Sequence, residues 1–162
     1  MQFEIDPSVI KRAQFPHNLL ISALFGFNLL MAPAVIALKF GMVGLLVPFL
    51  STGALIGAIY LRSRKNTLWF VDAHWQLAFK NSRWLMLGYA ITALLILAAW
   101  LVSLAAANPS MGHIIWTALT RIAILPTLAG VMITAIMEAG AISLASKREV
   151  PDSLVASFPP QV

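Results

Sequence analysis

Residues 84–106 read WLMLGYAITALLILAAWLVSLAA, and none of these side chains is charged. A helix needs about 20 mostly apolar residues to cross the hydrocarbon core of a bilayer. That core offers no water to pair with the backbone, so every N–H and C=O group must find its partner within the segment. The stretch therefore predicts a transmembrane helix.

The rest of the chain has the same character. Of its 162 residues, 60% are hydrophobic and only 10% are charged, whereas about 25% are charged in an ordinary soluble domain. This composition excludes a water-soluble fold. We predict an all-α integral membrane bundle at 19–145, with transmembrane helices at about 19–38, 42–61, 84–106 and 113–145, a polar arm at 1–18, an inner loop at 62–83 and a tail at 146–162.

Most basic residues fall on one side of these four helices. If the N-terminus lies in the cytoplasm, nine of the eleven Lys and Arg residues lie on the inner side, as the positive-inside rule requires. Membrane topology therefore explains the net charge of +5, and no nucleic-acid partner is needed. We expect the arm and the tail to be cytoplasmic, and the protein to lie in the bacterial cytoplasmic (inner) membrane.

The last apolar stretch contains two charged side chains. It runs for 33 residues, or about 50 Å as a helix, so it must tilt, kink at Pro126 or project from the membrane. Arg121 and Glu138 lie within it but about 25 Å apart along the axis, which is too far to pair. Charges inside a span usually face protein or water, so both are candidate functional residues.

Glu138 shares a helical face with two threonines. Thr127, Thr134 and Glu138 are spaced by seven and four residues, which brings them to nearly the same angle at 3.6 residues per turn. One interpretation is that this face lines the bundle interior, where Glu138 binds a cation or a proton. The alternative is that Glu138 pairs with an Arg or Lys of the inner loop, or with a partner subunit.

Two further features indicate how the helices pack. Asn28 lies in the middle of the first span, where its amide needs a partner on a neighbouring helix. Gly53 and Gly57 form a GxxxG pair in the second span, and small residues at this spacing allow two helix backbones to approach closely. We favour a contact within the bundle, with a contact to a second subunit as the alternative.

The inner loop is unusually aromatic. It begins with the basic residues Arg62, Arg64 and Lys65, and it continues through Trp69 and Trp75 without a proline or glycine. We predict an interfacial amphipathic helix here, with the aromatic side chains in the headgroup layer or on protein and the basic residues against anionic lipid. The alternative is that the third span extends into the cytoplasm as one long rod.

The same loop contains a short motif, Phe70-Val71-Asp72-x-His74-x-x-x-Ala78. It lies between a basic stretch at the end of one membrane helix and the start of another. In this setting it resembles a signature of small bacterial membrane proteins distantly related to a plastid inner-envelope import component. That family usually continues with an Asn-Phe pair, where this chain has Phe79-Lys80. The resemblance implies a membrane-embedded helical bundle and assigns no activity.

No catalytic, cofactor or metal site is predicted. The chain has no cysteine, which excludes disulfides, iron–sulfur ligation and thiol chemistry. His17, His74 and His113 are expected at an inner boundary, in the inner loop and at an outer boundary. They should therefore not converge on one haem or metal ion.

Two functional hypotheses follow. The first is a non-catalytic membrane subunit that packs against a larger membrane complex and assists its assembly, stability or lipid contacts. The alternative is a small transporter or channel component, in which Glu138 and the Thr127–Thr134 face line an oligomeric ion or proton pathway. The expected partners are the lipid bilayer and either other membrane subunits or a second copy of the chain.

Overall fold

The computed structural model describes residues 3–65 and 67–160, apart from the side chains at 41–43 and 45. Position 66 of the predicted inner loop and the outermost residues of the predicted arm and tail lie outside these ranges. Every element of regular secondary structure among the described residues is a helix, which confirms the all-α class. Four helical stretches are long and apolar enough to cross a membrane, namely Pro7–Ala37, Leu46–Ser63, Trp69–Leu104 and Pro109–Ser146.

The chain divides into two compact units. The first consists of Met1–Ser82 together with Ala135–Val162, and the second consists of Arg83–Thr134. Each unit is therefore described by itself.

The first span is built from three consecutive helices in the first unit. In α1 (Pro7–Ala23), the Asp6 carboxylate caps the N-terminus by accepting a 2.7 Å hydrogen bond from the Ser8 amide. The π-helix η1 (Leu24–Met31) and α2 (Ala32–Ala37) complete the span. Pro33, which has no amide hydrogen and crowds the preceding turn, directly follows the wider turns of η1. The helix thus begins inside the predicted polar arm.

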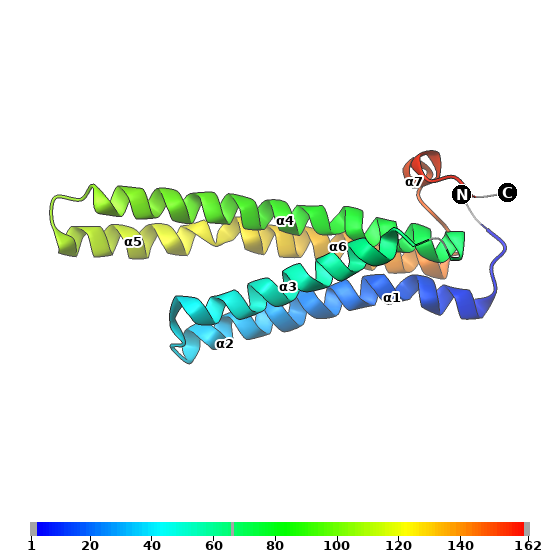
Figure 1. Ribbon diagram of the computed structural model, residues 1–162, viewed down its shortest axis with the longest axis horizontal. Helices are drawn as coiled ribbons and strands as arrows, with labels where there is room; N and C mark the ends of the chain where they lie inside the picture. The colour runs from blue at the N-terminus through cyan, green and yellow to red at the C-terminus, as the bar shows by residue number, and fades with distance from the viewer. Residues whose placement is uncertain (1–2, 66, 161–162) are drawn as a thin grey trace. The chain divides into compact units, whose positions relative to one another are not determined.

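Helix α3 (Gly41–Ser63) returns beside the first span, and it contacts α1, η1 and α2 (Figure 1). Asn28 of η1 donates a hydrogen bond of 3.3 Å to the Thr52 hydroxyl of α3. That hydroxyl in turn donates to the Pro48 carbonyl at 2.9 Å. The expected partner of Asn28 on a neighbouring helix is therefore present.

Helix α4 (Trp69–Leu104) is one continuous helix of 36 residues. The prediction of a separate interfacial helix in the inner loop is therefore wrong, and the long-rod alternative describes the chain. No proline or glycine lies between 67 and 83 to end the helix. The aromatic side chains Phe70 and Trp75 are buried in protein contacts, so this part of α4 does not need the headgroup layer to cover them.

In the second unit, the later part of α4 runs beside α5 (Pro109–Ala123) and the beginning of α6 (Leu125–Ser146) (Figure 1). The predicted single helix at 113–145 is divided at Ile124, two residues before the proline expected to kink it. A Cβ atom added to Gly88 would lie 2.6 Å from the Pro126 carbonyl oxygen, and one added to Gly130 would lie 3.0 Å from that of Trp84. These glycines let the two backbones touch.

The GxxxG pair, Gly53 and Gly57, brings no other described helix backbone of this chain into close contact. Among the described residues, a Cβ atom added to Gly53 or Gly57 would meet nothing within 4 Å. The favoured prediction, a helix contact of these glycines inside the bundle, is therefore not met. The close approaches of the second unit use Gly88, Gly112 and Gly130 instead.

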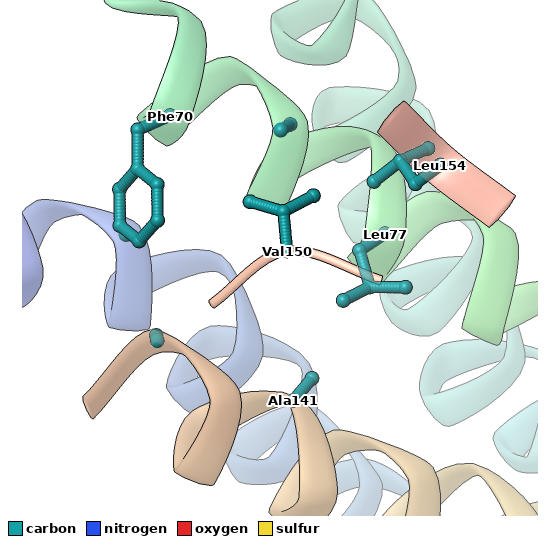
Figure 2. Close-up of a cluster of buried hydrophobic side chains, with 8 residues drawn as sticks. Phe70, Leu77, Ala141, Val150 and Leu154 are labelled. Carbon is teal, nitrogen blue, oxygen red and sulfur yellow. The ribbon is translucent and has the colours of Figure 1, made fainter. Parts of the chain in front are cut away.

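A hydrophobic cluster holds the first unit together (Figure 2). The chain turns back after α6, and Val150 and Leu154 of this returning segment lie beside Leu77 of α4 and Ala141 of α6. Helix α7 (Asp152–Ser157) belongs to the same segment. Part of the segment predicted as a tail is thus packed against α4 and α6. The cluster consists of Ala13, Phe70, Ala73, Leu77, Ala141, Ala145, Val150 and Leu154.

Candidate functional site

Glu138 lies in the interior of the first unit with no exposed surface. Its Oε2 atom is 2.7 Å from His17 Nδ1, and its Oε1 atom accepts a hydrogen bond of 2.7 Å from the Asn81 amide. The sequence offered an inner-loop Arg or Lys as its partner, and the structure provides a histidine of α1 instead. Both carboxylate oxygens are therefore bonded to side chains of other helices.

A second histidine extends this arrangement. His17 Nε2 lies 3.0 Å from His74 Nδ1, and the two rings meet edge to face with centroids 5.2 Å apart. Both side chains are buried, at 0% and 1% exposure. We call Glu138, His17, His74 and Asn81 the polar cluster. Two of the three histidines thus meet in the polar cluster, whereas His113 lies exposed on α5.

The spacing of small and apolar residues explains why these polar side chains point inward. On α6, Ala141 and Ala145 follow Glu138 by three and seven residues, so all three lie on the face that is buried in the interior of the first unit. On α4, Asn81 follows His74 by seven residues and shares its face. Each helix thus carries its polar group within an apolar stripe, and packing the stripes brings the groups together.

The far nitrogen of His74 is the one unsatisfied atom of the polar cluster among the described residues. Its Nε2 atom is buried and has no hydrogen-bond partner of regular geometry. The backbone carbonyl of Glu149 interacts with this ring, but it does not reach regular hydrogen-bond geometry. A buried polar atom without a partner is uncommon and calls for an explanation.

A second polar group lies at the start of α4 and has a structural role. Arg62 donates to Asp72 Oδ1 at 2.9 Å, and the carboxylate also accepts from the Thr67 hydroxyl at 2.9 Å and from its amide at 2.5 Å. The Arg62 guanidinium also lies over the Trp75 ring, 5.4 Å from its centroid. Asp72 therefore closes the turn between α3 and α4 in the manner of a capping box.

The other polar residues singled out on the fourth span have different surroundings. In the second unit, Thr127 bonds to the Thr92 hydroxyl of α4 at 2.8 Å. Thr134 is fully buried, and its hydroxyl has no partner among the described residues. Arg121 is exposed in the last turn of α5, where a cation interacts favourably with the helix dipole.

The residues expected at the membrane interface fall into two groups, buried aromatic side chains and exposed basic side chains. Trp69 donates from its ring nitrogen to the Phe158 carbonyl at 3.0 Å, and Trp75 is only 9% exposed. These two aromatic side chains contact protein. Arg64 and Lys65 are exposed, and Arg64 also bonds to the Tyr60 hydroxyl at 3.3 Å. The basic side chains remain available to lipid headgroups.

The motif from Phe70 to Ala78 lies entirely in the buried part of α4. All five of its specified side chains are at most 3% exposed. They serve three purposes in the first unit, since Asp72 closes a turn, His74 belongs to the polar cluster and the apolar members fill the interior. The motif is thus a packing surface that carries two polar groups.

Sequence reasoning placed Glu138 and missed its partners. The available signal was depth, because His17, His74 and Asn81 all fall near the predicted inner boundary, and Glu138 lies about 10 Å inside the predicted end of its span at 145 by helical rise. Residue type gave no further indication of which groups would meet.

Comparison with known proteins places this arrangement in no family. No family model, no curated protein and no solved structure matches the chain. Within residues 3–65 and 67–160, no group of three His, Cys, Asp or Glu side chains has the geometry to hold a metal ion. The helices that span the membrane, the polar cluster and the exposed faces of the helices must therefore carry any argument about function.

Proposed function

We propose that this chain is a non-catalytic subunit that helps to assemble or stabilise a larger membrane complex. It lies in the bacterial cytoplasmic membrane with both termini in the cytoplasm. The side chains that could do chemistry support this reading. Glu138 and Asp72 are both buried and bonded to groups of the same chain, which holds the helices in register.

The observation that carries the proposal is the outward face of α3. Gly53, Ala54 and Ala58 are exposed there, and Gly57 is half-buried. Apart from the neighbouring backbone of α3 itself, no described atom lies within 4 Å of a Cβ atom at either glycine. Because helices in lipid associate through close backbone contact at small residues, this face is suited to receive a helix of another chain.

The charge distribution supports the orientation. Arg62, Arg64 and Lys65 follow α3, and Lys147 and Arg148 follow α6. Basic residues are retained on the cytoplasmic side of a membrane. Both ends of the chain then lie in the cytoplasm.

The test is extraction in mild detergent followed by native mass analysis. We expect the wild-type chain to copurify with unlike membrane chains, and the Gly53→Leu/Gly57→Leu variant to lose them. Ala118→Leu is the matched control, because this exposed alanine of α5 has isoleucines four residues before and after it instead of small residues. A wild-type chain that runs alone, or a double variant that keeps its partners, would contradict the proposal.

A second candidate is a component of an ion or proton transporter. The observation that favours it is the contact of Glu138 with His17, which in turn contacts a second ionisable ring, that of His74. This candidate requires a homo-oligomer whose ion flux falls when Glu138→Gln is introduced. The same native mass measurement separates the two candidate functions, because a transporter of this kind assembles with copies of itself and an accessory subunit binds unlike chains.

A further inference from the structure

The polar cluster contains three groups that can each gain or lose a proton, arranged in one line. Glu138 Oε2 faces His17 Nδ1 at 2.7 Å, and His17 Nε2 faces His74 Nδ1 at 3.0 Å. These groups come from α6, α1 and α4. Asn81, which donates to the other carboxylate oxygen, is neutral, and the Phe70 ring packs 4.9 Å from that of His74.

The hydrogen-bond directions permit two states of this line. In the first, His17 Nδ1–H donates to the Glu138 carboxylate, and His74 Nδ1–H donates to His17 Nε2. His74 Nε2 then carries a lone pair, because a neutral imidazole has one N–H donor and one acceptor. The backbone carbonyl of Glu149, which interacts with this ring, is also an acceptor, so it cannot bond to that lone pair. The cluster as a whole carries one negative charge in the interior.

The second state differs by one proton. A proton binds to His74 Nε2, the His74 Nδ1 proton passes to His17 Nε2, and the His17 Nδ1 proton passes to Glu138 Oε2. Each N–H bond that breaks is replaced by a new N–H or O–H bond along the same contact, so the two hydrogen bonds of the line survive with their direction reversed, and Asn81 still donates to Glu138 Oε1. His74 Nε2–H now points a donor at the Glu149 carbonyl. The buried charge is neutralised, which removes a large desolvation cost.

We propose that Glu138, His17 and His74 form a buried binding site for a single proton, which is taken up at His74 Nε2. The unsatisfied nitrogen is explained by this site, since it is the atom at which the proton arrives. The proposal does not depend on the accessory role, because a chain without partners can still bind the proton.

The way to His74 Nε2 passes under the returning C-terminal segment. Glu149 belongs to this segment, and Val150 and Leu154 next to it are buried at 1% and 5% exposure against α4 and α6 (Figure 2). These apolar side chains exclude water from the ring. A proton from the aqueous side therefore reaches the site when this segment opens locally.

The test uses the full chain in lipid nanodiscs with ¹⁵N-labelled histidine. Nuclear magnetic resonance reports the tautomer and protonation of each ring between about pH 5 and pH 8. We expect His17 and His74 to respond together over one pH interval, with a scalar coupling between His17 Nε2 and His74 Nδ1. The exposed His113 should respond separately, and His113→Gln assigns its signal.

Glu138→Gln is the decisive variant. It should abolish the joint response of His17 and His74 and leave that of His113 unchanged. Two rings that keep one tautomer while the wild-type protein stays folded and His113 responds would overturn the proposal. So would an unaltered joint response in Glu138→Gln. The wild-type measurement decides the matter even if this variant does not fold.

The access route is tested by the rate of the response after a pH jump. Val150→Ser weakens the packing of the returning C-terminal segment on α4 and α6. It should increase the rate at which the His74 signal changes at least about tenfold, without changing the pH interval of that change. Ala156→Ser on the exposed side of α7 is the control and should leave the rate unchanged. An unaltered rate in Val150→Ser would overturn the assignment of His74 Nε2 as the point of uptake.

Discussion

His17 Nδ1 lies 2.7 Å from Glu138 Oε2, although 121 positions of sequence separate the two residues and neither side chain has any exposed surface. The pair joins α1 to α6 in the first unit. A buried carboxylate is stable only when its charge is compensated and its oxygens are bonded. The helix packing of this unit and the protonation of the polar cluster are therefore coupled properties.

Loss of the carboxylate is expected to be far more costly than loss of apolar bulk on the same helix. Glu138→Ala leaves His17 and Asn81 buried without their partner, and we expect a decrease of about 3–5 kcal/mol in the free energy of unfolding. Ile136→Ala, at a position 68% exposed, is the matched control and should change it little. Denaturant titration in detergent micelles measures both. Equal losses in the two variants would show that the buried pair does not stabilise the fold.

Two glycines should respond in opposite ways to the same substitution. Gly88→Ala places a methyl group 2.6 Å from the Pro126 carbonyl oxygen, so the backbones of α4 and α6 must separate. Overpacking of this kind costs about 1–3 kcal/mol. Gly53→Ala meets no described atom within 4 Å, and the better helix propensity of alanine should stabilise α3 by up to about 1 kcal/mol. Thermal unfolding followed by circular dichroism checks both signs.

The ion pair of Arg62 and Asp72 should contribute to stability through its hydrogen bonds. The carboxylate is 2% exposed and the arginine 23%, so the pair is only partly screened by water. Asp72→Ala should lower the free energy of unfolding by about 1.5–3 kcal/mol, which is typical of bonds to a charged group. A double-mutant cycle with Arg62→Ala isolates the pair. Strictly additive losses would mean that Asp72 acts only by closing the turn through Thr67.

The N-terminal cap of α1 should depend on acidity. Hydrogen bonds from the side chain and backbone of Ser8 lower the pKa of Asp6 below its ordinary value of 3.8. A carboxylate with a lowered folded-state pKa stabilises the fold above its unfolded pKa, and this contribution is lost as pH falls through the folded value. Fraying of the first turn is therefore expected only below about pH 3.8. Hydrogen exchange of the Ser8 and Val9 amides measures it.

The matched variant removes this dependence on pH. In Asp6→Ala, the first turn of α1 should fray equally at all values of pH, because no carboxylate remains to accept from the Ser8 amide. Amide protection that still falls with acid in this variant would assign the effect to another group.

The class of fold could be predicted from residues such as 84–106 because the need to pair the backbone in lipid leaves few options. The need of Asn28 for a partner could be predicted for the same reason. A side-chain amide within a span requires a hydrogen bond, and Asn28 donates one to Thr52. These predictions rest on a local requirement, which a single sequence expresses directly.

The errors have a different physical origin. Gly53 and Gly57 match a packing motif, but the motif says only that a backbone can approach, and it does not say which one. The partners of Glu138 could not be chosen because His17 and His74 belong to other helices, and their relative rotation is set by packing. The inner loop was misjudged because its aromatic side chains suited a membrane interface as well as a protein interior.

The π-helical turns at 24–31 make the geometry of the polar cluster depend on chain length. Each amide there reaches back five residues in place of four, so the segment accommodates extra chain within one continuous span. The α-helical turns between His17 and this segment hold no such extra residue, so deleting one residue there would turn the start of α1 by about 100° relative to α2. His17 would then face away from Glu138 with every side chain still present. Insertions and deletions in the first span should thus be tolerated less well than exchanges of its lipid-facing residues.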